Sequence, residues 1–336
     1  RVPTAIPESL RMNVCILGER SEQLDEGMKN VSIQLHNRLN EKGINSTLLD
    51  LRDIDTVGFW RTLQRLDSDV VHLVPGPTGK GLTLLRILAE AKDCETVATV
   101  TQARFNRFSR SAVRYLRPSL VYVQSETERT RFEGLGHTTE LLPSGVDLEK
   151  FTPGNEGVKM QLRSELGLPK DEQVFLHVGH FKRGRGVESL LELQSYGHVV
   201  IVGSPSTGPE AELVESLRNA GATVQTEYVP DIEKYYRAAD VYVFPVVDEG
   251  NSIQAPLSVL EAMACNLPVV ATRFGGLVDL FEEGNGLRFI SSFNAIEASD
   301  LEFSTVHTRD KVSKYSWEAI VDQVIDSYHR LCNVEH

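Results

Sequence analysis

One stretch of the chain, residues 261–276, combines residue types that can bind a nucleotide. It reads Glu-Ala-Met-Ala-Cys-Asn-Leu-Pro-Val-Val-Ala-Thr-Arg-Phe-Gly-Gly. This pattern predicts a helix start, a short turn, a buried strand and a glycine pair, with Glu261 in the first turn of the helix. Amides at a helix N-terminus attract phosphate, and a carboxylate beside them can bind ribose hydroxyls. The alternative is an ordinary strand–helix unit of an α/β protein.

Length and composition indicate the class of protein that would contain such a site and the number of its domains. The chain has 336 residues, 41% of them hydrophobic and 24% charged, which is ordinary for a soluble globular protein and long enough for two domains. No apolar run approaches the roughly 20 residues that a membrane-spanning helix needs.

The charge is shared unevenly between the two halves. The formal net charge is −12, with 20 basic and 20 acidic residues in 1–150 but 15 basic and 27 acidic residues in 151–336. An excess of acid of this size argues against nucleic acid as a partner.

The opening segment and the cysteines indicate a reducing compartment. The first seven residues, Arg-Val-Pro-Thr-Ala-Ile-Pro, have no apolar core of the kind that a signal peptide needs. The cysteines are scattered, without the paired spacing of a metal site, at Cys15, Cys94, Cys265 and Cys332. We therefore expect buried thiols and a cytoplasmic location.

The first half of the chain alternates strand-like and helix-like segments. Residues 13–17 form an apolar run that ends at Gly18, and Val31, Leu35 and Leu39 follow at helical spacing. Further strands are expected at 46–51, 69–74, 96–101 and 120–124. Parallel strands that are buried on both faces and linked by helices satisfy this pattern.

The second half repeats the scheme, with strands expected at 173–178, 198–202, 241–245 and 268–272. Residues 141–154 are rich in turn formers and predict the boundary between two domains. Two doubly wound α/β domains would face each other across a cleft, with ligands at the carboxyl ends of the strands.

Several motifs occur in the order typical of one enzyme family. Besides residues 261–276, they are the linker Leu142-Pro-Ser-Gly-Val-Asp-Leu-Glu-Lys-Phe151, the loop Val178-Gly-His-Phe-Lys-Arg-Gly-Arg-Gly186, the helix–strand step 235–245 and Tyr315-Ser-Trp-Glu318. Over nearly its whole length the chain resembles the family-four glycosyltransferases of the GT-B fold. The resemblance implies two Rossmann-like domains, one for the acceptor (1–150) and one for the nucleotide sugar (151–314), and a C-terminal helix (315–336) that crosses back to the first.

The same resemblance places the diphosphate of a sugar donor on the loop 179–186. His180 and Arg185 match the family's Arg and Lys, and we expect both to act catalytically by stabilising the departing β-phosphate. A histidine near its ordinary pKa of about 6.5 is only partly charged at neutral pH. Lys182 and Arg183 can supply the missing charge, and the alternative is a solvated basic loop.

Residues 253–261 resemble the other half of the donor site, for which the family pattern is Glu-x7-Glu. Glu261 matches the second Glu, which binds ribose, although it could instead interact only with the helix dipole. The amides of Leu257 and Ser258 match those that bind phosphate. The remaining expected donor-binding residues are Gly18, Gly179, Gln254 and Val229, the last through backbone contacts with the base.

Two departures from the family pattern bear on activity. Ile253 stands at the first Glu position and cannot hydrogen-bond to a sugar. Either Gln254 or the upstream acids at 248 and 249 replace it, or the sugar is not a common hexose, or transfer is lost. The family also has a His after the fourth strand, where this chain has Thr101 and Gln102, which we expect to contact the sugar or the acceptor by hydrogen bonds.

A series of arginines follows these two residues at intervals of three or four: Arg104, Arg107, Arg110, Arg114 and Arg117. On a helix this spacing places all five near one face. Such a face predicts attraction to an anionic lipid surface or a phosphorylated acceptor. The alternative is a solvated helix whose arginines pair with acids elsewhere.

The chain is therefore expected to be a glycosyltransferase that moves a sugar from a nucleotide-diphosphate sugar to a sugar or lipid-linked acceptor. The resemblance implies retention of configuration without a metal or a further cofactor. A lipid-linked acceptor would bring this cytoplasmic protein to the inner face of the membrane. Two alternatives remain: a catalytically silent GT-B module that binds nucleotide or a partner protein, and a nucleotide-sugar epimerase.

Overall fold

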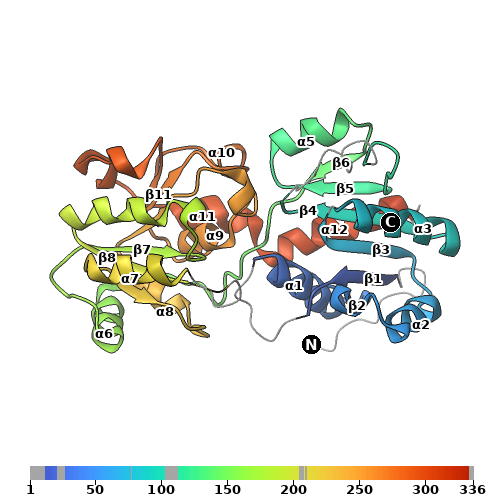
Figure 1. Ribbon diagram of the computed structural model, residues 1–336, viewed down its shortest axis with the longest axis horizontal. Helices are drawn as coiled ribbons and strands as arrows, with labels where there is room; N and C mark the ends of the chain where they lie inside the picture. The colour runs from blue at the N-terminus through green and yellow to red at the C-terminus, as the bar shows by residue number, and fades with distance from the viewer. Residues whose placement is uncertain are drawn as a thin grey trace. The chain divides into compact units, whose positions relative to one another are not determined.

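The computed structural model describes residues 12–20, 27–76, 78–102, 113–203, 208 and 210–332. The chain forms two compact units: residues 1–144 with 317–336, and residues 145–316. In the described residues each unit contains a parallel six-stranded sheet with helices packed against it (Figure 1). The predicted α/β fold with two Rossmann-like domains is confirmed.

The sheet of the first unit has the strand order β2-β1-β3-β4-β5-β6. Its strands are β1 (Asn13–Gly18), β2 (Asn45–Asp50), β3 (Val70–Gly76), β4 (Glu95–Val100), β5 (Leu120–Val123) and β6 (Thr139–Leu141). Its helices are α1 (Gly27–Glu41), η2 (Leu51–Asp53), α2 (Val57–Arg65), α3 (Gly79–Lys92), α5 (Glu126–Glu133) and α12 (Trp317–Leu331). Strands β1, β3 and β5 are mainly apolar, as expected for a parallel sheet with helices on both faces.

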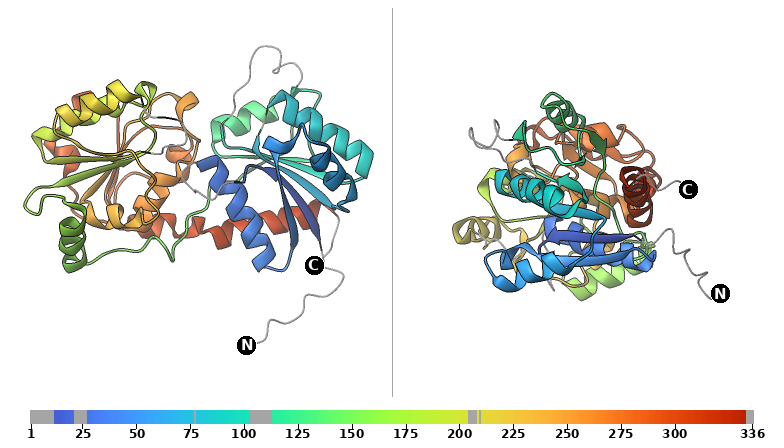
Figure 2. Two further views of the ribbon diagram at one scale, coloured as in Figure 1. Left: turned by 60° about the horizontal axis from the view of Figure 1, so that its bottom comes forward. Right: turned by 90° about the vertical axis from the view of Figure 1, so that its right-hand side faces the viewer.

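The C-terminal helix α12 belongs to the first unit, where it lies beside α1 (Figure 2). The Tyr328 hydroxyl lies 2.6 Å from Nδ1 of the buried His72 on β3. Gln323 donates to the carbonyl of Leu141, and Lys42 at the end of α1 pairs with Asp322 at 2.6 Å. These polar contacts join α12 to β3, to the end of β6 and to the residue that follows α1. They therefore hold this helix against the sheet.

The sheet of the second unit has the order β12-β11-β10-β7-β8-β9. Its strands are β7 (Val174–Val178), β8 (His198–Val202), β9 (Thr223–Gln225), β10 (Val241–Phe244), β11 (Val269–Thr272) and β12 (Leu287–Ile290). The α-helices are α6 (Glu156–Leu166), α7 (Ala211–Asn219), α8 (Glu233–Ala238), α9 (Leu257–Ala264), α10 (Leu277–Leu280) and α11 (Thr308–Val312). Short 3-10 helices are η3 (Arg183–Arg185), η4 (Val187–Ser195), η6 (Glu249–Asn251), η7 (Phe293–Ala295), η8 (Ala298–Leu301) and η9 (Ser313–Tyr315).

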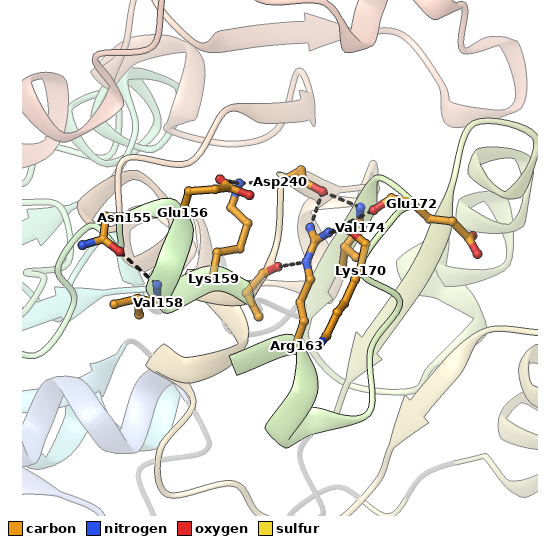
Figure 3. Close-up of polar contacts among 10 residues, drawn as sticks. Asn155, Glu156, Val158, Lys159, Arg163, Lys170, Glu172, Val174 and Asp240 are labelled. Carbon is orange, nitrogen blue, oxygen red and sulfur yellow. Dashed lines mark hydrogen bonds and ion pairs between the residues drawn. The ribbon is translucent and has the colours of Figure 1, made fainter. Parts of the chain in front are cut away.

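A buried arginine fastens α6 to the amino ends of β7 and β10 (Figure 3). Arg163 is 2% exposed and donates to Asp240 and to the carbonyls of Ala238 and Glu172. Asp240 also accepts from Lys159 and from the amide of Val174. Burial opposes ionisation of Asp240, but these donors hold its pKa below the usual value. This cluster lies at the strand ends opposite those where ligands bind in such sheets.

Two further expectations concern membranes and thiols. Of the helices in the described residues, none is both long and apolar enough to cross a membrane. Cys15 and Cys265 are buried, as expected, whereas Cys94 and Cys332 are only partly buried. All four are free thiols.

Candidate functional site

The carboxyl ends of β7 and β10 lie side by side in the second unit, with Tyr242 opposite Leu176 in the parallel register. Tyr242 is completely buried, and its hydroxyl donates to Oγ of Ser258 at 2.7 Å and lies 3.4 Å from the carbonyl oxygen of Val178. Val178 is the last residue before the loop 179–186, and Ser258 lies in the first turn of α9. The structure thus brings together the two segments that the sequence analysis assigned to one diphosphate.

The loop 179–186 can adopt its path because glycines occupy the crowded positions. A Cβ on Gly179 would lie 2.7 Å from Nε2 of His177, which is buried beneath the loop. Gly186 has φ +69°, and a Cβ there would lie 2.8 Å from the carbonyl oxygen of Pro245. The side chain of Asn251 donates to the carbonyl of Gly184 at 2.6 Å. The loop is therefore held against the segment that leads from β10 to α9.

Arg185 is the buried cation of this loop. Its side chain is 9% exposed, and burial lowers its pKa to about 10. Its Nε and the Nε2 of His177 have no hydrogen-bond partner among the described residues. Burial lowers the pKa of His177 to about 4, so this imidazole is neutral at physiological pH. Buried polar atoms usually have a partner, so the Nε–H of Arg185 is available to donate to a ligand, whereas Nε2 of His177 on β7 can only accept, because its Nδ1 donates to the carbonyl of Val243.

The other polar residues of the loop differ in exposure. His180 and Lys182 are partly buried. Arg183 is 60% exposed and lies within 3.8 Å of three carboxylates, those of Glu188, Glu210 and Glu212. The charge of Arg183 is therefore already compensated by neighbouring acids, unlike that of the buried Arg185.

Helix α9 begins earlier than the sequence analysis predicted. The stretch 261–276 was expected to open a helix with Glu261 in its first turn, but α9 starts at Leu257, so Glu261 lies in its second turn. Pro256 precedes the helix, and no side chain of the described residues caps it. Proline cannot continue a helix in the N-terminal direction, which places the start after it. The first amides, those of Leu257 and Ser258, have no acceptor within the helix.

Glu261 is partly buried one turn behind these amides. Its Oε2 accepts a hydrogen bond of 2.8 Å from the hydroxyl of Tyr236 on α8. Burial raises the pKa of Glu261 to about 7, and the Tyr236 hydrogen bond and the charge of Lys150 oppose this rise. A carboxylate with one oxygen held in this way can accept hydrogen bonds from a sugar diol with the other.

Gln254 and the glycine pair 275–276 lie next to each other. The backbone carbonyl of Gln254 accepts from the amide of Gly276, and a Cβ on Gly275 would lie 2.7 Å from Oε1 of Gln254. Gln254 is 2% exposed, and its Oε1 has no hydrogen-bond partner among the described residues. Ile253 is partly buried beside it. Upstream, Asp248 is exposed and caps η6 by accepting from the amide of Gly250.

Four residues near this site were not singled out from the sequence: His177, Tyr236, Tyr242 and Lys150. The Nζ of Lys150 donates to the carbonyl of Pro230, next to the predicted base contact Val229, and lies 3.6 Å from Glu233. For Tyr242 the sequence did contain an indication, because a tyrosine within an apolar strand such as β10 usually needs a hydrogen-bond partner for its hydroxyl.

The remaining predicted site residues lie in the first unit. Gly18 ends β1, where a Cβ would lie 2.6 Å from Cβ of Ser32. Thr101 is buried just after β4, its Oγ1 without a partner among the described residues, and Gln102 is partly buried. These positions are at the carboxyl-terminal edge of that unit's sheet.

The predicted arginine face can be followed only in part. Arg104, Arg107 and Arg110 lie outside the described residues. Arg114 is exposed, but the chain turns there and runs without helix to Pro118. The expectation that one helical face extends to Arg117 is therefore wrong, because a proline disfavours helical conformation in the residue before it.

A pocket of about 660 Å³ opens elsewhere on the second unit, beside β11, α10 and α11. Arg273, Asp279, Phe281, Lys311 and Lys314 are among its lining residues. None of the residues predicted to bind the donor lines this pocket, so the candidate site rests on the contacts around Tyr242 and Glu261.

Comparisons with known proteins agree with this geometry. Residues 172–299 match the family model described as glycosyl transferases group 1. The chain is 31% identical over 218 residues to a D-inositol 3-phosphate glycosyltransferase of Geodermatophilus obscurus, a match that covers 56% of this chain and 47% of the relative. The chain thus spans about half the length of this relative.

Solved structures resemble nearly the whole chain. Sucrose-phosphate synthase from Thermosynechococcus elongatus has a TM-score of 0.78 at 20% identity, with 97% of this chain and 100% of that chain covered. HepE from Anabaena, in complex with UDP and glucose, has a TM-score of 0.71 at 18% identity, with 94% and 99% covered. The predicted resemblance to GT-B glycosyltransferases of family four is confirmed.

Proposed function

We propose that this chain, which carries a glycosyl transferases group 1 domain on a GT-B fold, transfers a sugar from a nucleoside-diphosphate sugar to an acceptor hydroxyl. One observation carries the proposal. Tyr242 contacts both Val178, which leads into the glycine-rich loop, and Ser258, in the first turn of α9. A loop with a buried arginine and the uncapped start of a helix then lie at the same end of two adjacent strands.

The diphosphate binds between these two segments. Arg185 and His180 face it from the loop, and the amides of Leu257 and Ser258 donate to it from α9. When the bond between the anomeric carbon and the β-phosphate oxygen breaks, the negative charge on the diphosphate increases. Fixed donors and a buried guanidinium stabilise that charge without reorganisation of solvent, so these groups carry the catalysis.

The nucleoside lies beyond the diphosphate. Glu261 accepts hydrogen bonds from the ribose hydroxyls, and the backbone near Val229 contacts the base. The UDP-glucose complex described for HepE, a structural neighbour, supports a nucleotide-sugar donor. Lys182 adds positive charge to the loop, and Arg183, whose charge is shared with three carboxylates, adds less.

The reaction retains the configuration at the anomeric carbon and needs no metal. The acceptor oxygen forms the new bond to this carbon, and its proton passes to the departing phosphate oxygen, which acts as the local base. Gln254 directly follows Ile253, the position where the family pattern has a glutamate, and its Oε1, unpartnered among the described residues, contacts the donor sugar.

The acceptor binds to the first unit near Gly18, Thr101 and Gln102. A phosphorylated or lipid-linked hydroxyl compound fits the arginines that follow Gln102, and the curated relative's name, a D-inositol 3-phosphate glycosyltransferase, is in line with a phosphorylated acceptor. We place the protein in the cytoplasm, at the anionic inner face of the membrane when it acts on lipid.

Thermal shift and product analysis test this function. UDP, GDP and ADP are screened first, because a ligand that binds the folded state raises the melting temperature by mass action. The sugar form of the preferred nucleotide is then incubated with acceptors, and release of nucleoside diphosphate is followed by chromatography. We expect one nucleotide to bind and its sugar to be transferred or slowly hydrolysed. Absence of binding by all three would refute the function.

A silent nucleotide-binding module is the second candidate, because Ile253 lacks the hydrogen-bonding group of the family glutamate. The same experiment separates the two: the module binds a nucleoside diphosphate but neither transfers nor hydrolyses any sugar. The substitution Ile253→Glu should then produce measurable sugar transfer if the missing carboxylate is the cause.

A further inference from the structure

We propose that Tyr236 is a positioning residue that holds Oε2 of Glu261, so that Oε1 is presented to the ribose of a bound nucleotide. The inference rests on the proposed function and adds to it a residue that does not itself touch the ligand. Its starting point is the 2.8 Å hydrogen bond from the Tyr236 hydroxyl to Glu261.

The hydroxyl of Tyr236 has a fixed position because its ring cannot move. The side chain is completely buried and packs edge-on against Phe151, with ring centroids 5.7 Å apart. On another side its ring lies 5.8 Å from that of Tyr242. A tyrosine has only two side-chain torsions, so packing on two sides fixes the direction of the hydroxyl. Burial also raises the pKa of Tyr236 well above its usual value, which keeps the hydroxyl a donor.

Glu261, in contrast, has three side-chain torsions and is not fully enclosed by its neighbours. Within the described part of the chain, Tyr236 is the hydrogen-bond donor to its carboxylate. A glutamate that is free to rotate would lose conformational entropy on binding a ligand. The hydrogen bond from Tyr236 removes part of that cost in advance, because one carboxylate oxygen is already in place.

The hydrogen bond from Tyr236 also affects the ionisation of Glu261, together with the charges around it. Lys150, from the segment before α6, favours the carboxylate, whereas Glu233 on α8 disfavours it. The other titratable groups that interact with it are Tyr236 on α8, Tyr242 on β10 and Cys265, the residue after α9. Because burial raises the pKa of Glu261 to about 7, loss of the Tyr236 donor would raise it further, and the carboxyl would be protonated at neutral pH.

The test measures ribose recognition rather than overall affinity. Binding of the preferred nucleoside diphosphate and of its 2′-deoxy and 3′-deoxy analogues is measured by calorimetry between pH 6 and 9. The ratio of the ribo and deoxy affinities reports the contact with Glu261. Titration of the diphosphate affects all three ligands alike, so it cancels in the ratio.

In the wild-type protein at pH 8, the nucleoside diphosphate should bind about tenfold or more tightly than at least one of its two deoxy analogues, as for a hydrogen bond to a charged acceptor. Tyr236→Phe keeps the ring and removes the hydroxyl. We expect this variant to reduce the ratio at least threefold. The ratio falls as the pH is lowered, and in the variant this fall should occur at a higher pH than in the wild type. Tyr242→Phe, the matched substitution in the same core, should weaken all three ligands alike and leave the ratio and its pH dependence unchanged.

A double-mutant cycle distinguishes positioning from a general packing effect. In the Glu261→Ala background, which has no acceptor for the Tyr236 hydroxyl, Tyr236→Phe should have no further effect on the ratio. An unchanged ratio and pH profile in Tyr236→Phe, or an equal reduction in the Ala background, would overturn the assignment. If the wild-type protein binds no nucleoside diphosphate, the proposed function fails as well. If it binds one and only Tyr236→Phe is without effect, the function stands and the role of Tyr236 does not.

Discussion

The hydroxyl of Tyr242 lies 2.7 Å from Oγ of Ser258, which joins the middle of a buried strand to the first turn of α9. The same hydroxyl lies 3.4 Å from the carbonyl of Val178, where the glycine-rich loop begins. One buried side chain thus sets the spacing between the two segments that we assign to the diphosphate.

Removal of this hydroxyl should weaken nucleotide binding. We expect Tyr242→Phe to lower the affinity for the preferred nucleoside diphosphate by a factor of about 3–10, the usual value of one hydrogen bond. Calorimetric titration measures the effect. A variant that is as stable as the wild type and binds the nucleotide equally well would contradict the bridging role.

The buried arginine of the loop should matter more than its exposed neighbour. Arg185→Met should reduce affinity for the nucleoside diphosphate by at least about tenfold, because a charge-assisted contact with phosphate is lost. Arg183→Met is the matched variant, and its loss should be several-fold smaller because three carboxylates already surround Arg183. Equal losses in the two variants would count against the assignment of Arg185.

In the absence of ligand, the ionised carboxylate of Glu261 should lower the free energy of unfolding, and the size of this effect should depend on pH. Burial raises its pKa from 4.5 to about 7, so the folded protein favours the protonated carboxyl. This stabilisation is complete below about pH 4.5 and is lost as the pH rises through 7. Glu261→Gln should therefore stabilise the unliganded protein by about 1–2 kcal/mol at pH 8 and by much less at pH 5. Denaturant unfolding at both pH values checks this, and an effect that does not change with pH would contradict it.

The cluster around Arg163 should affect stability and not ligand recognition. Arg163→Met leaves Asp240 without its buried partner and three backbone carbonyls without a donor, which should cost about 3 kcal/mol of unfolding free energy. Arg129→Met, which removes exposed ion pairs within α5, should have little effect. Urea titration compares the two variants, and similar unfolding midpoints would show that the buried pair is not stabilising.

The arginines after Gln102 should govern binding to membranes. Sedimentation with vesicles that contain anionic phospholipid should show binding that weakens as salt is added, and vesicles of phosphatidylcholine alone should not bind. The double variant Arg107→Glu and Arg114→Glu should lose most of this binding. Binding that does not depend on salt, or no binding to either vesicle, would rule out this role.

The layers of the fold could be predicted because buried parallel strands leave a strong local signal. The apolar runs at 13–17, 198–202 and 241–245 all form interior strands of the two sheets. β6, β9 and β12 have only three or four residues and lie at or near a sheet edge, where partly polar residues weaken the pattern.

The site was predictable only where its residues are close in sequence. The motif around Glu261 identified the segment, but its helix start was misplaced, since only Pro256 marks the true beginning. The contacts of Tyr236 with Glu261 and of Tyr242 with Val178 join residues 25 and 64 positions apart. Such contacts depend on which strands are neighbours in the sheet, and a local pattern does not contain this information.

Hydrogen exchange with and without the preferred nucleoside diphosphate tests most directly whether the loop and α9 share one ligand. Amide exchange is followed by mass spectrometry across the whole chain, with nucleoside alone as the control that lacks phosphate. We predict that the nucleoside diphosphate slows exchange in residues 179–186 and in residues 257–261 together. The nucleoside alone should protect each segment less than the nucleoside diphosphate does. Protection of only one of the two segments, or of neither, would contradict the account.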